Sequence, residues 1–267
     1  MKKGVKIAVG VLATVAVLGG AALYLSQTVV KYNTIEGAFP TVNDIMEPYP
    51  YTDVEVPDEY RACSIKGIDF EAPDGLYWLY PDETEGVKSG IIVDDDDPDK
   101  RSLLICVMDK ETESPVDSAD LTARGYFDKR MLKGLKKLGY EKPENYHDLV
   151  YLTNTFDLKK CNKLSVYEVD AAYNLALLKE IMTPSLIAYN LSDSESEDKE
   201  IEAGFYYYDT DTMKSFVMDG MGQNGSYEIQ INIFDKNDLD LMQSMFIISD
   251  DPQVARQIAK TVAIAED

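Results

Sequence analysis

The first 30 residues constrain the chain most, because almost every side chain in them is apolar. Between Ile7 and Val30 no side chain is ionisable apart from the phenol of Tyr24. An α-helix rises about 1.5 Å per residue, so about 20 residues cross a hydrocarbon core roughly 30 Å thick. Residues 1–30 are therefore predicted to contain one transmembrane helix that precedes the folded domain.

Charges beside this segment predict its orientation. Lys2, Lys3 and Lys6 stand on its amino side, and no acid occurs among the first 30 residues. Basic residues stay on the cytoplasmic side, so the chain after Lys31 is expected outside the cytoplasm, held at the cell membrane by a single pass. Two interpretations stay open, a retained signal anchor and a signal peptide cleaved after Ala22. The length of the uncharged run favours the anchor.

The charge of the whole chain narrows the classes of partner. Its 26 Lys and Arg against 48 Asp and Glu give a formal net charge of −22. Proteins bind nucleic acid through Lys and Arg that replace the counterions of the phosphates, and an acidic surface repels a polyanion over a Debye length of about 8 Å. Nucleic acid is therefore excluded as an expected partner. A cell-envelope protein or glycan is expected instead.

Residues 31–59 have the composition of a stalk. Prolines recur among acids without a sustained hydrophobic period, and proline fixes φ and removes a backbone donor. The pattern predicts an acidic, extended segment that holds the following domain away from the membrane. Tyr49 and Tyr51 lie between prolines, and the sequence leaves open whether they pack on the domain or face water. The prolines of the segment are Pro40, Pro48, Pro50 and Pro57.

Residues 60–267 are predicted to form an α+β domain with a mainly antiparallel sheet and helices packed on it. Alternating apolar residues predict strands early and late in this range, and helical spacing predicts helices between them. The clearest element is a half-buried strand over 227–233. The helical middle, 118–183, is either part of one large domain or an insertion. Strands are predicted over 62–70, 76–80, 90–93, 102–108, 203–208, 214–218, 227–233 and 241–248, and helices over 118–138, 143–152, 165–183 and 252–262.

Short motifs predict where elements turn or end. Gly139 stands where a left-handed helix cap is needed, and Asp251 before Pro252 is typical of a helix start. Asn224 followed by Gly225 predicts a type I′ hairpin turn, because both central residues of that turn need positive φ. These motifs support the alternation of strands and helices.

Two stretches of the domain resemble a known layout. They are Ile68-Asp69-Phe70-Glu71-Ala72-Pro73, which precedes hairpin strands, and Phe246-Ile247-Ile248-Ser249, which precedes the closing helix. Together they resemble PsbP-like domains of anchored or lipid-tethered extracytoplasmic proteins, whereas the helical middle departs from that layout. The resemblance implies a binding or accessory role without chemistry, and it carries no residue role over to this chain.

Side chains suited to catalysis are few. Cys63, Cys106 and Cys161 show no short ligand spacing and are interpreted as small hydrophobes, although a disulfide between two of them stays open. His147 is the single histidine, which excludes metal sites that need several imidazoles. Its place in a predicted amphipathic helix favours a surface or boundary imidazole over a catalytic one, and its spacing to Cys161 does not support a catalytic dyad. No residue is assigned to catalysis.

Carboxylates in the predicted loop 94–100 are the candidate metal ligands. They supply the hard oxygen atoms that Ca²⁺ prefers, although the run lacks the central Gly and closing Glu of an EF-hand. A solvated loop is the competing interpretation. No cofactor is expected unless Ca²⁺ binds here. The candidate ligands are Asp94, Asp95, Asp96, Asp97 and Asp99.

Aromatic residues supply the candidate binding surface. Tyr77, Trp78 and Tyr80 can stack on sugar rings or contact a protein partner, with burial for packing as the competing interpretation. No motif identifies a reaction. The expected function is therefore that of a membrane-anchored extracytoplasmic binding or accessory protein without catalysis. Two alternatives stay open, a hydrolase of surface or wall polymers that uses paired carboxylates, and a weak calcium-binding surface domain.

Overall fold

The computed structural model describes residues 33–84, 87–93, 101–110, 126–160, 166–183, 204–220 and 226–265. These residues form both helices and mainly antiparallel strands, so the predicted α+β class is confirmed. None of the helices in these ranges is long and apolar enough to span a bilayer. The predicted transmembrane segment 1–30 lies outside the described residues.

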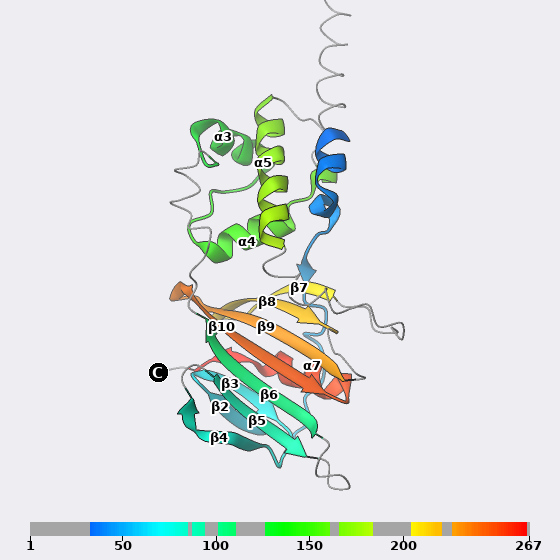
Figure 1. Cartoon of the computed structure of the whole chain (residues 1–267), viewed down its shortest axis with the longest axis vertical. Coiled ribbons are helices and arrows are strands. Elements are labelled where there is room, and N and C mark those ends of the chain that lie inside the picture. The colour runs from blue at the N-terminus through cyan, green and yellow to red at the C-terminus, as the bar shows by residue number, and fades with distance from the viewer. Residues whose placement is uncertain are drawn as a thin grey trace, which may run out of the picture. The chain divides into compact units, whose positions relative to one another are not determined.

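The chain divides into two compact units, each assembled from separate stretches of sequence (Figure 1). We call the first the helical unit, and its described residues are 33–45, 126–143, 152–160 and 166–183. We call the second the sheet unit, because it contains all the described strands. Its described residues are 46–84, 87–93, 101–110, 144–151, 204–220 and 226–265.

The helical unit is built around the long helix α5. Figure 1 shows α3 and α5 side by side, and the helical residues 33–38 and η1 lie on another side of α5. Apolar side chains from all these segments form its core. The elements are the helix 33–38, η1 (Pro40–Asn43), α3 (Lys129–Leu138), the last four residues of α4 (Tyr146–Thr155), η2 (Leu158–Lys160) and α5 (Val166–Thr183).

Local capping determines the ends of α3. The Asp128 carboxylate accepts hydrogen bonds from the backbone N–H groups of Arg130 and Met131, both at 2.8 Å, so the helix begins at Lys129. We predicted one helix over 118–138. This prediction is wrong at Phe127, which precedes the helix, and residues 118–125 lie outside the described residues. The predicted left-handed cap at Gly139 is confirmed by its φ of 85°.

The other two predicted helices of the middle region are also present. α4 begins at Tyr146, three residues later than predicted, because the Asn145 side chain accepts the Asp148 backbone N–H at 2.8 Å and so caps this start. α5 ends at Thr183, the residue before Pro184, as predicted. Helical spacing together with flanking prolines and a cap therefore places these helices to within a few residues.

Close approach of α3 to α5 depends on Gly134. A Cβ atom at this position would lie 2.5 Å from the Tyr167 carbonyl oxygen and 2.6 Å from the Ala171 Cβ. Glycine is the one residue that leaves room for the neighbouring backbone here. The two helices bury Met131 and Leu135 of α3 in the core of the helical unit.

An eight-stranded sheet dominates the sheet unit, in the order β1-β7-β8-β9-β10-β6-β5-β4, and all its pairs are antiparallel except β1 with β7. A smaller sheet has the order β11-β3-β2. The strands are β1 (Glu47–Pro48), β2 (Arg61–Ile65), β3 (Ile68–Ala72), β4 (Tyr77–Thr84), β5 (Val87–Val93), β6 (Arg101–Lys110), β7 (Gly204–Asp209), β8 (Met213–Asp219), β9 (Tyr227–Asp235), β10 (Asp238–Ser249) and β11 (Ala263–Ile264).

The predicted strand over 62–70 is instead a hairpin. β2 and β3 pair antiparallel, and Lys66 and Gly67 form the two-residue turn between them with φ values of 51° and 77°. Positive φ at both central residues is the geometry of a type I′ turn. The prediction of a single strand missed this turn because Lys-Gly is a weaker turn signal than Asn-Gly. The predicted Asn224–Gly225 turn lies outside the described residues.

Strand β9 shows the predicted alternation, but both of its faces are buried. Ile229, Ile231 and Ile233 lie on the apolar face, as predicted. Gln230 and Asn232 on the opposite face are 3% and 2% exposed, so the half-buried strand that we expected is wrong on its polar side. Asn232 Oδ1 accepts hydrogen bonds from Gln230 Nε2 and from the Ser244 hydroxyl, and these bonds offset the cost of burial.

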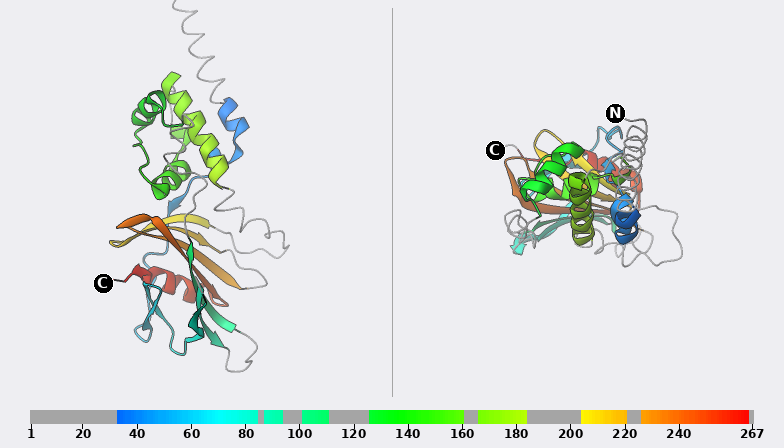
Figure 2. Two further views of the ribbon diagram at one scale, coloured as in Figure 1. Left: turned by 60° about the vertical axis from the view of Figure 1, so that its left-hand side comes forward. Right: turned by 90° about the horizontal axis from the view of Figure 1, so that it is seen from above.

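The closing helix α7 (Pro252–Thr261) lies between the two sheets (Figure 2). The Asp251 carboxylate accepts the Gln253 backbone N–H at 2.8 Å and Pro252 occupies the first helical position, so the predicted start is confirmed. Buried Ala255 and Ile258 face the apolar core that β3, β9 and β10 share. This core joins the two sheets through α7.

Part of the predicted stalk 31–59 is built into the two units. Ile35 and Val42 are buried in the helical unit, and Tyr49 is 3% exposed in the sheet unit. The rings of Tyr49 and Tyr51 meet edge to face with centroids 5.5 Å apart. Both tyrosines therefore pack on the sheet unit, which answers the question that the sequence left open.

Candidate functional site

The candidate residues predicted from the sequence lie on the outer strand β4 or outside the described residues. Tyr77 and Trp78 lie on the outer strand β4, where their backbones pair with Ile91 and Gly90. The side chains of Tyr77, Trp78 and Tyr80 lie outside the described side chains, and Asp94, Asp95, Asp96, Asp97 and Asp99 lie outside the described residues. Among the described residues, no three side chains of His, Cys, Asp or Glu are grouped closely enough to hold a metal ion. Cys63 and Cys106 are free thiols.

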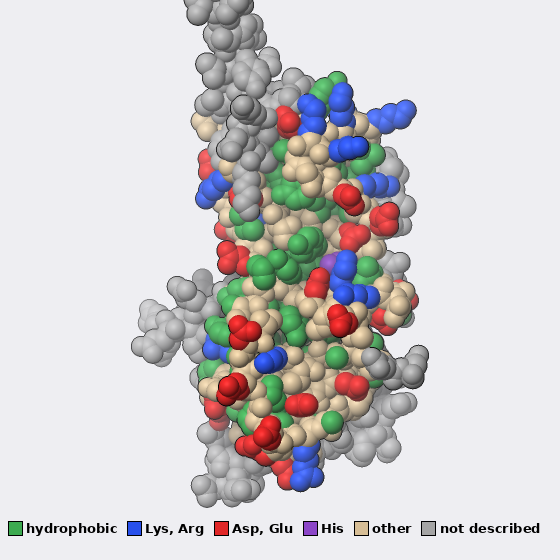
Figure 3. Space-filling view, turned by 180° about the vertical axis from the view of Figure 1, so that it is seen from behind, with side chains coloured by type: hydrophobic (Ala, Val, Ile, Leu, Met, Phe, Trp, Pro, Cys, Tyr) green, Lys and Arg blue, Asp and Glu red, His purple; other side chains and the backbone are tan. Residues whose placement is uncertain are grey.

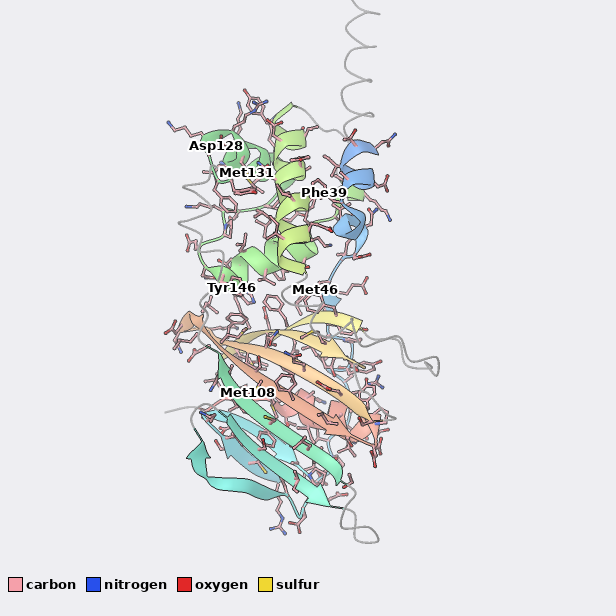
Figure 4. All side chains as sticks on the ribbon, viewed as in Figure 1. Phe39, Met46, Met108, Asp128, Met131 and Tyr146 are labelled. Atoms are coloured by element: carbon pink, nitrogen blue, oxygen red, sulfur yellow. The ribbon has the colours of Figure 1, made fainter. Side chains whose placement is uncertain are left out.

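A pocket of about 410 Å³ opens in the helical unit. Pockets that take small ligands usually have volumes from about 300 to 1,000 Å³. Figure 4 labels Asp128 and Met131 on the α3 wall of this pocket, together with Phe39 between the helix 33–38 and η1. The lining comes from three segments that are far apart in the sequence, namely Thr34 and Ile35, then Asp128, Arg130 and Met131, then Val169, Asp170, Tyr173 and Asn174.

Apolar and polar side chains share the pocket lining. Ile35, Met131 and Val169 are buried and form its apolar part. Arg130 forms an ion pair with Asp170 that links α3 to α5. The Asn174 amide donates to the Met131 sulfur at 3.6 Å. This mixture suits a ligand that has one apolar part and one polar or charged part.

The polar side chains of the pocket lining are mostly engaged with other protein groups. Its two carboxylates are engaged, since Asp128 caps α3 and Asp170 pairs with Arg130. Among the described residues that line it there is no His, Cys or Lys to act as base or nucleophile. The arrangement can therefore hold a ligand by contact and hydrogen bonds, and it supplies no catalytic dyad.

Exposed apolar side chains continue from the pocket along α5. Tyr173 is 44% exposed, and its ring meets that of Phe39 edge to face with centroids 5.2 Å apart. Ile181 is 48% exposed and stands eleven residues after Asp170, which places both on one side of the helix. Both side chains are large hydrophobes that α5 leaves exposed. Sequence reasoning missed this exposure because helical spacing alone does not show which apolar side chains of a helix stay uncovered.

A buried polar cluster in the sheet unit was also missed. Asp219 at the end of β8 is 3% exposed, and its Oδ2 atom lies 3.5 Å from the Nε atom of Arg256 on α7. Burial raises the pKa of the Asp219 carboxyl above its ordinary value, although the Arg256 charge opposes this shift. The Arg256 guanidinium lies between the Tyr51 ring, 3.9 Å from its centroid, and the Tyr227 ring, 5.0 Å from its centroid.

This cluster has the features of a structural clamp between β8 and α7. Arg256 donates to the Tyr227 hydroxyl at 2.6 Å, while its Nε atom makes no hydrogen bond among the described residues and faces Asp219 as an ion pair. Burial and then the Asp219 charge raise the pKa of the Tyr49 hydroxyl. The groups that face Asp219 are thus a phenol and a guanidinium, whereas hydrolysis by paired acids needs a second carboxylate.

His147 is buried in the sheet unit against aromatic rings. Its imidazole stacks on Phe216 with centroids 4.8 Å apart, and Phe234 meets it edge to face at 5.3 Å. Neither ring nitrogen has a hydrogen-bond partner among the described residues, and Nδ1 lies 3.7 Å from Asp148 Oδ1. Burial and the nearby Lys214 charge lower the pKa of His147 to about 4, although Asp148 opposes this. The imidazole is therefore neutral at pH 7 and serves as a packed aromatic ring. The predicted surface or boundary position is wrong, because the aromatic rings around His147 leave it only 2% exposed.

Lys179 is the most buried cation of the helical unit among the residues described. It is 1% exposed, and its Nζ atom has no hydrogen-bond partner in the described part of the chain. Burial lowers the pKa of the amine to about 8, and the charges of Asp44 and Asp157 oppose this shift. The pocket lining does not include Lys179.

Comparison with known proteins adds no assignment. No protein-family model matches the chain, and no curated protein matches it. The function is therefore inferred from the geometry of the two units.

Proposed function

We propose that this protein is a membrane-anchored, extracytoplasmic binding protein without catalysis, and that its helical unit recognises a component of the cell envelope. The observation that carries the proposal is the pocket between the helix 33–38, α3 and α5, bordered by the exposed side chain of Tyr173. The pocket volume and its mixed lining suit a small amphiphilic molecule or a side chain of a partner protein.

The uncharged segment 1–30 supports the membrane part of the proposal. It is long enough to cross a bilayer, and the lysines before it favour a cytoplasmic amino terminus. An anchor confines the helical unit to the membrane surface and raises its effective concentration near other envelope components. Extraction of cell membranes with alkaline carbonate tests the anchor. The protein stays in the membrane pellet on this account, and its release would contradict the anchor.

Photocrosslinking in living cells tests the binding site. The full-length protein carries benzoylphenylalanine in place of Tyr173, beside the pocket, or in place of Leu241, which is 60% exposed in the sheet unit. We expect a discrete adduct from position 173 and none from position 241, because the ligand occupies the helical unit.

Filling the pocket provides the matched control. Asn174→Trp places a large side chain in the pocket and should abolish the adduct at position 173, while unfolding of the purified variant at the normal temperature shows that the fold is intact. An adduct that forms only at position 241, or one at position 173 that survives in folded Asn174→Trp, would contradict binding in the pocket.

A further inference from the structure

The helix α3 concentrates positive charge in a strongly acidic protein. Five of its ten residues are Lys or Arg and none is acidic, whereas the whole chain has a net charge of −22. All five are exposed, and Figure 3 shows Lys and Arg side chains gathered over part of the helical unit. The five residues are Lys129, Arg130, Lys133, Lys136 and Lys137.

Stability of the helical unit explains only some of these charges. Arg130 pairs with Asp170, and the Lys133 amine lies 4.2 Å from the centroid of the Tyr167 ring. Lys136 and Lys137 in the last turn favour the helix dipole. Lys129 stands in the first turn, where the dipole disfavours a cation. A basic residue at that end costs stability, so the concentration of charge points to a ligand of opposite sign.

The position of α3 in the helical unit brings this charge close to the proposed anchor. Thr34 and Ile35 line the same pocket as Asp128 and Arg130 at the start of α3. Only three residues separate Val30 from Thr34, and this stretch spans at most about 14 Å when fully extended. The headgroup layer of a bilayer is roughly 6 Å thick on each side. The start of α3 is therefore within reach of lipid headgroups.

We propose that α3 is a docking surface for anionic phospholipid headgroups of the membrane that holds the anchor. The proposal rests on the proposed function, because the anchor supplies the proximity. The complementary charge supplies the attraction, which at an anionic surface corresponds to about a fivefold gain in association per Lys or Arg. Docking of α3 would fix how the helical unit and its pocket face the membrane.

The acidic remainder of a second copy is the competing occupant. Its charge is also complementary to α3, but a second copy reaches α3 only by diffusion in the membrane plane. The headgroups lie within the reach of a few residues of the same chain. We therefore assign the surface to lipid and let the experiment detect the other occupant.

Hydrogen exchange of the full-length protein in vesicles tests the assignment. One set of vesicles is pure phosphatidylcholine, and the other contains about one third phosphatidylglycerol, an anionic lipid. We expect amides of residues 129–138 to exchange several-fold more slowly in the anionic vesicles. This protection should disappear near 1 M salt, where the Debye length falls to about 3 Å.

Two variants of equal charge sharpen the test. Lys129→Gln with Lys136→Gln removes two exposed cations from α3, and Gln preserves helix propensity. Lys142→Gln with Lys159→Gln removes two exposed cations elsewhere in the same unit. We expect the first variant to weaken the association of α3 with anionic headgroups about 25-fold, so that the amides of residues 129–138 lose their protection from exchange. The second variant should retain that protection.

The outcomes separate the two proposals. Equal exchange in both vesicles, with the protein still floating with the lipid, would overturn the lipid assignment and leave the anchor intact. Failure to float with vesicles would overturn the anchor, and the lipid assignment with it. Protection that rises with protein density in phosphatidylcholine would assign α3 to a second copy and overturn the lipid assignment.

Discussion

The two units of the molecule differ in what they pack and in what they expose. The sheet unit packs apolar strands from two sheets around α7 and pairs buried Asp219 with Arg256. The helical unit has an open pocket, exposed side chains on α5 and a basic helix. This difference supports the proposal that recognition is concentrated in the helical unit, with the sheet unit as its stable framework.

The largest expected effect separates the two units by stability. Ile231 is fully buried on the central strand β9, so Ile231→Ala should lower the unfolding free energy of the sheet unit by about 4 kcal/mol, from lost burial and the cavity left behind. Hydrogen exchange of β8 and β9 amides measures this loss. The matched change Ile181→Ala, at 48% exposure in the helical unit, should cost less than about 0.5 kcal/mol. An equal loss of stability in both variants would contradict the difference between the two units.

The next effect is an acid-dependent loss of stability in the sheet unit. His147 has a folded pKa of about 4 against an ordinary value of 6.5, so the unfolded state binds more protons between these pH values. Stability should therefore fall by about 3 kcal/mol as the pH drops from 6.5 to 4. His147→Phe preserves the stack on Phe216 and should make the unfolding free energy nearly independent of pH between 6.5 and 4. An unchanged acid limb in the variant would show that His147 stays unprotonated or solvated.

A second effect of the same physical kind belongs to the helical unit. The pKa of Lys179 is lowered to about 8 from 10.5, so the unfolded state again binds more protons, and stability should rise with pH between about 8 and 10.5. Lys179→Met fills a similar volume without a charge and should stabilise the unit at pH 7 by about 2 kcal/mol. Thermal unfolding against pH measures both. A destabilised variant would show that Asp44 and Asp157 compensate the buried charge fully.

The smallest effect concerns the contact of α3 with α5. Gly134→Ala gains helix propensity but presses its Cβ against the Tyr167 carbonyl, so a net loss of about 1 kcal/mol is expected. Gly37→Ala, where the new Cβ meets no atom within 4 Å, should instead stabilise its helix by up to about 1 kcal/mol. Amide exchange in α3 shows whether Gly134→Ala lowers stability, and amide exchange in residues 33–38 shows whether Gly37→Ala raises it. The same sign for both would contradict the close approach.

Local signals made much of the fold predictable. Asp251 with Pro252 predicted the start of α7 because a capping carboxylate and a proline act on their own turn, and Gly139 ended α3 for the same kind of reason. The Ile residues of β9 predicted a strand because side chains alternate along it. The hairpin at Lys66 and Gly67 was missed because its turn residues carry little local signal.

The candidate site was not predictable from local signals. Its pocket joins Thr34, Met131 and Tyr173, which are separated by 97 and 42 positions in the numbering, and single-sequence periodicity does not report contacts at that range. The Asp219 pair with Arg256 joins two elements in the same non-local way. Burial of Gln230 and Asn232 was missed because polar residues on a strand are by default placed in water.

Radical footprinting tests most directly the claim that recognition lies in the helical unit. Hydroxyl radicals label the full-length protein in intact cells and, separately, the purified protein, and peptide mass spectrometry compares exposed side chains of both units. The account predicts that Tyr173 and Ile181 are protected in cells, while Tyr151 and Leu241 of the sheet unit are labelled equally in both. Protection of Tyr151 or Leu241, with Tyr173 and Ile181 unchanged, would place recognition on the sheet unit and contradict the account.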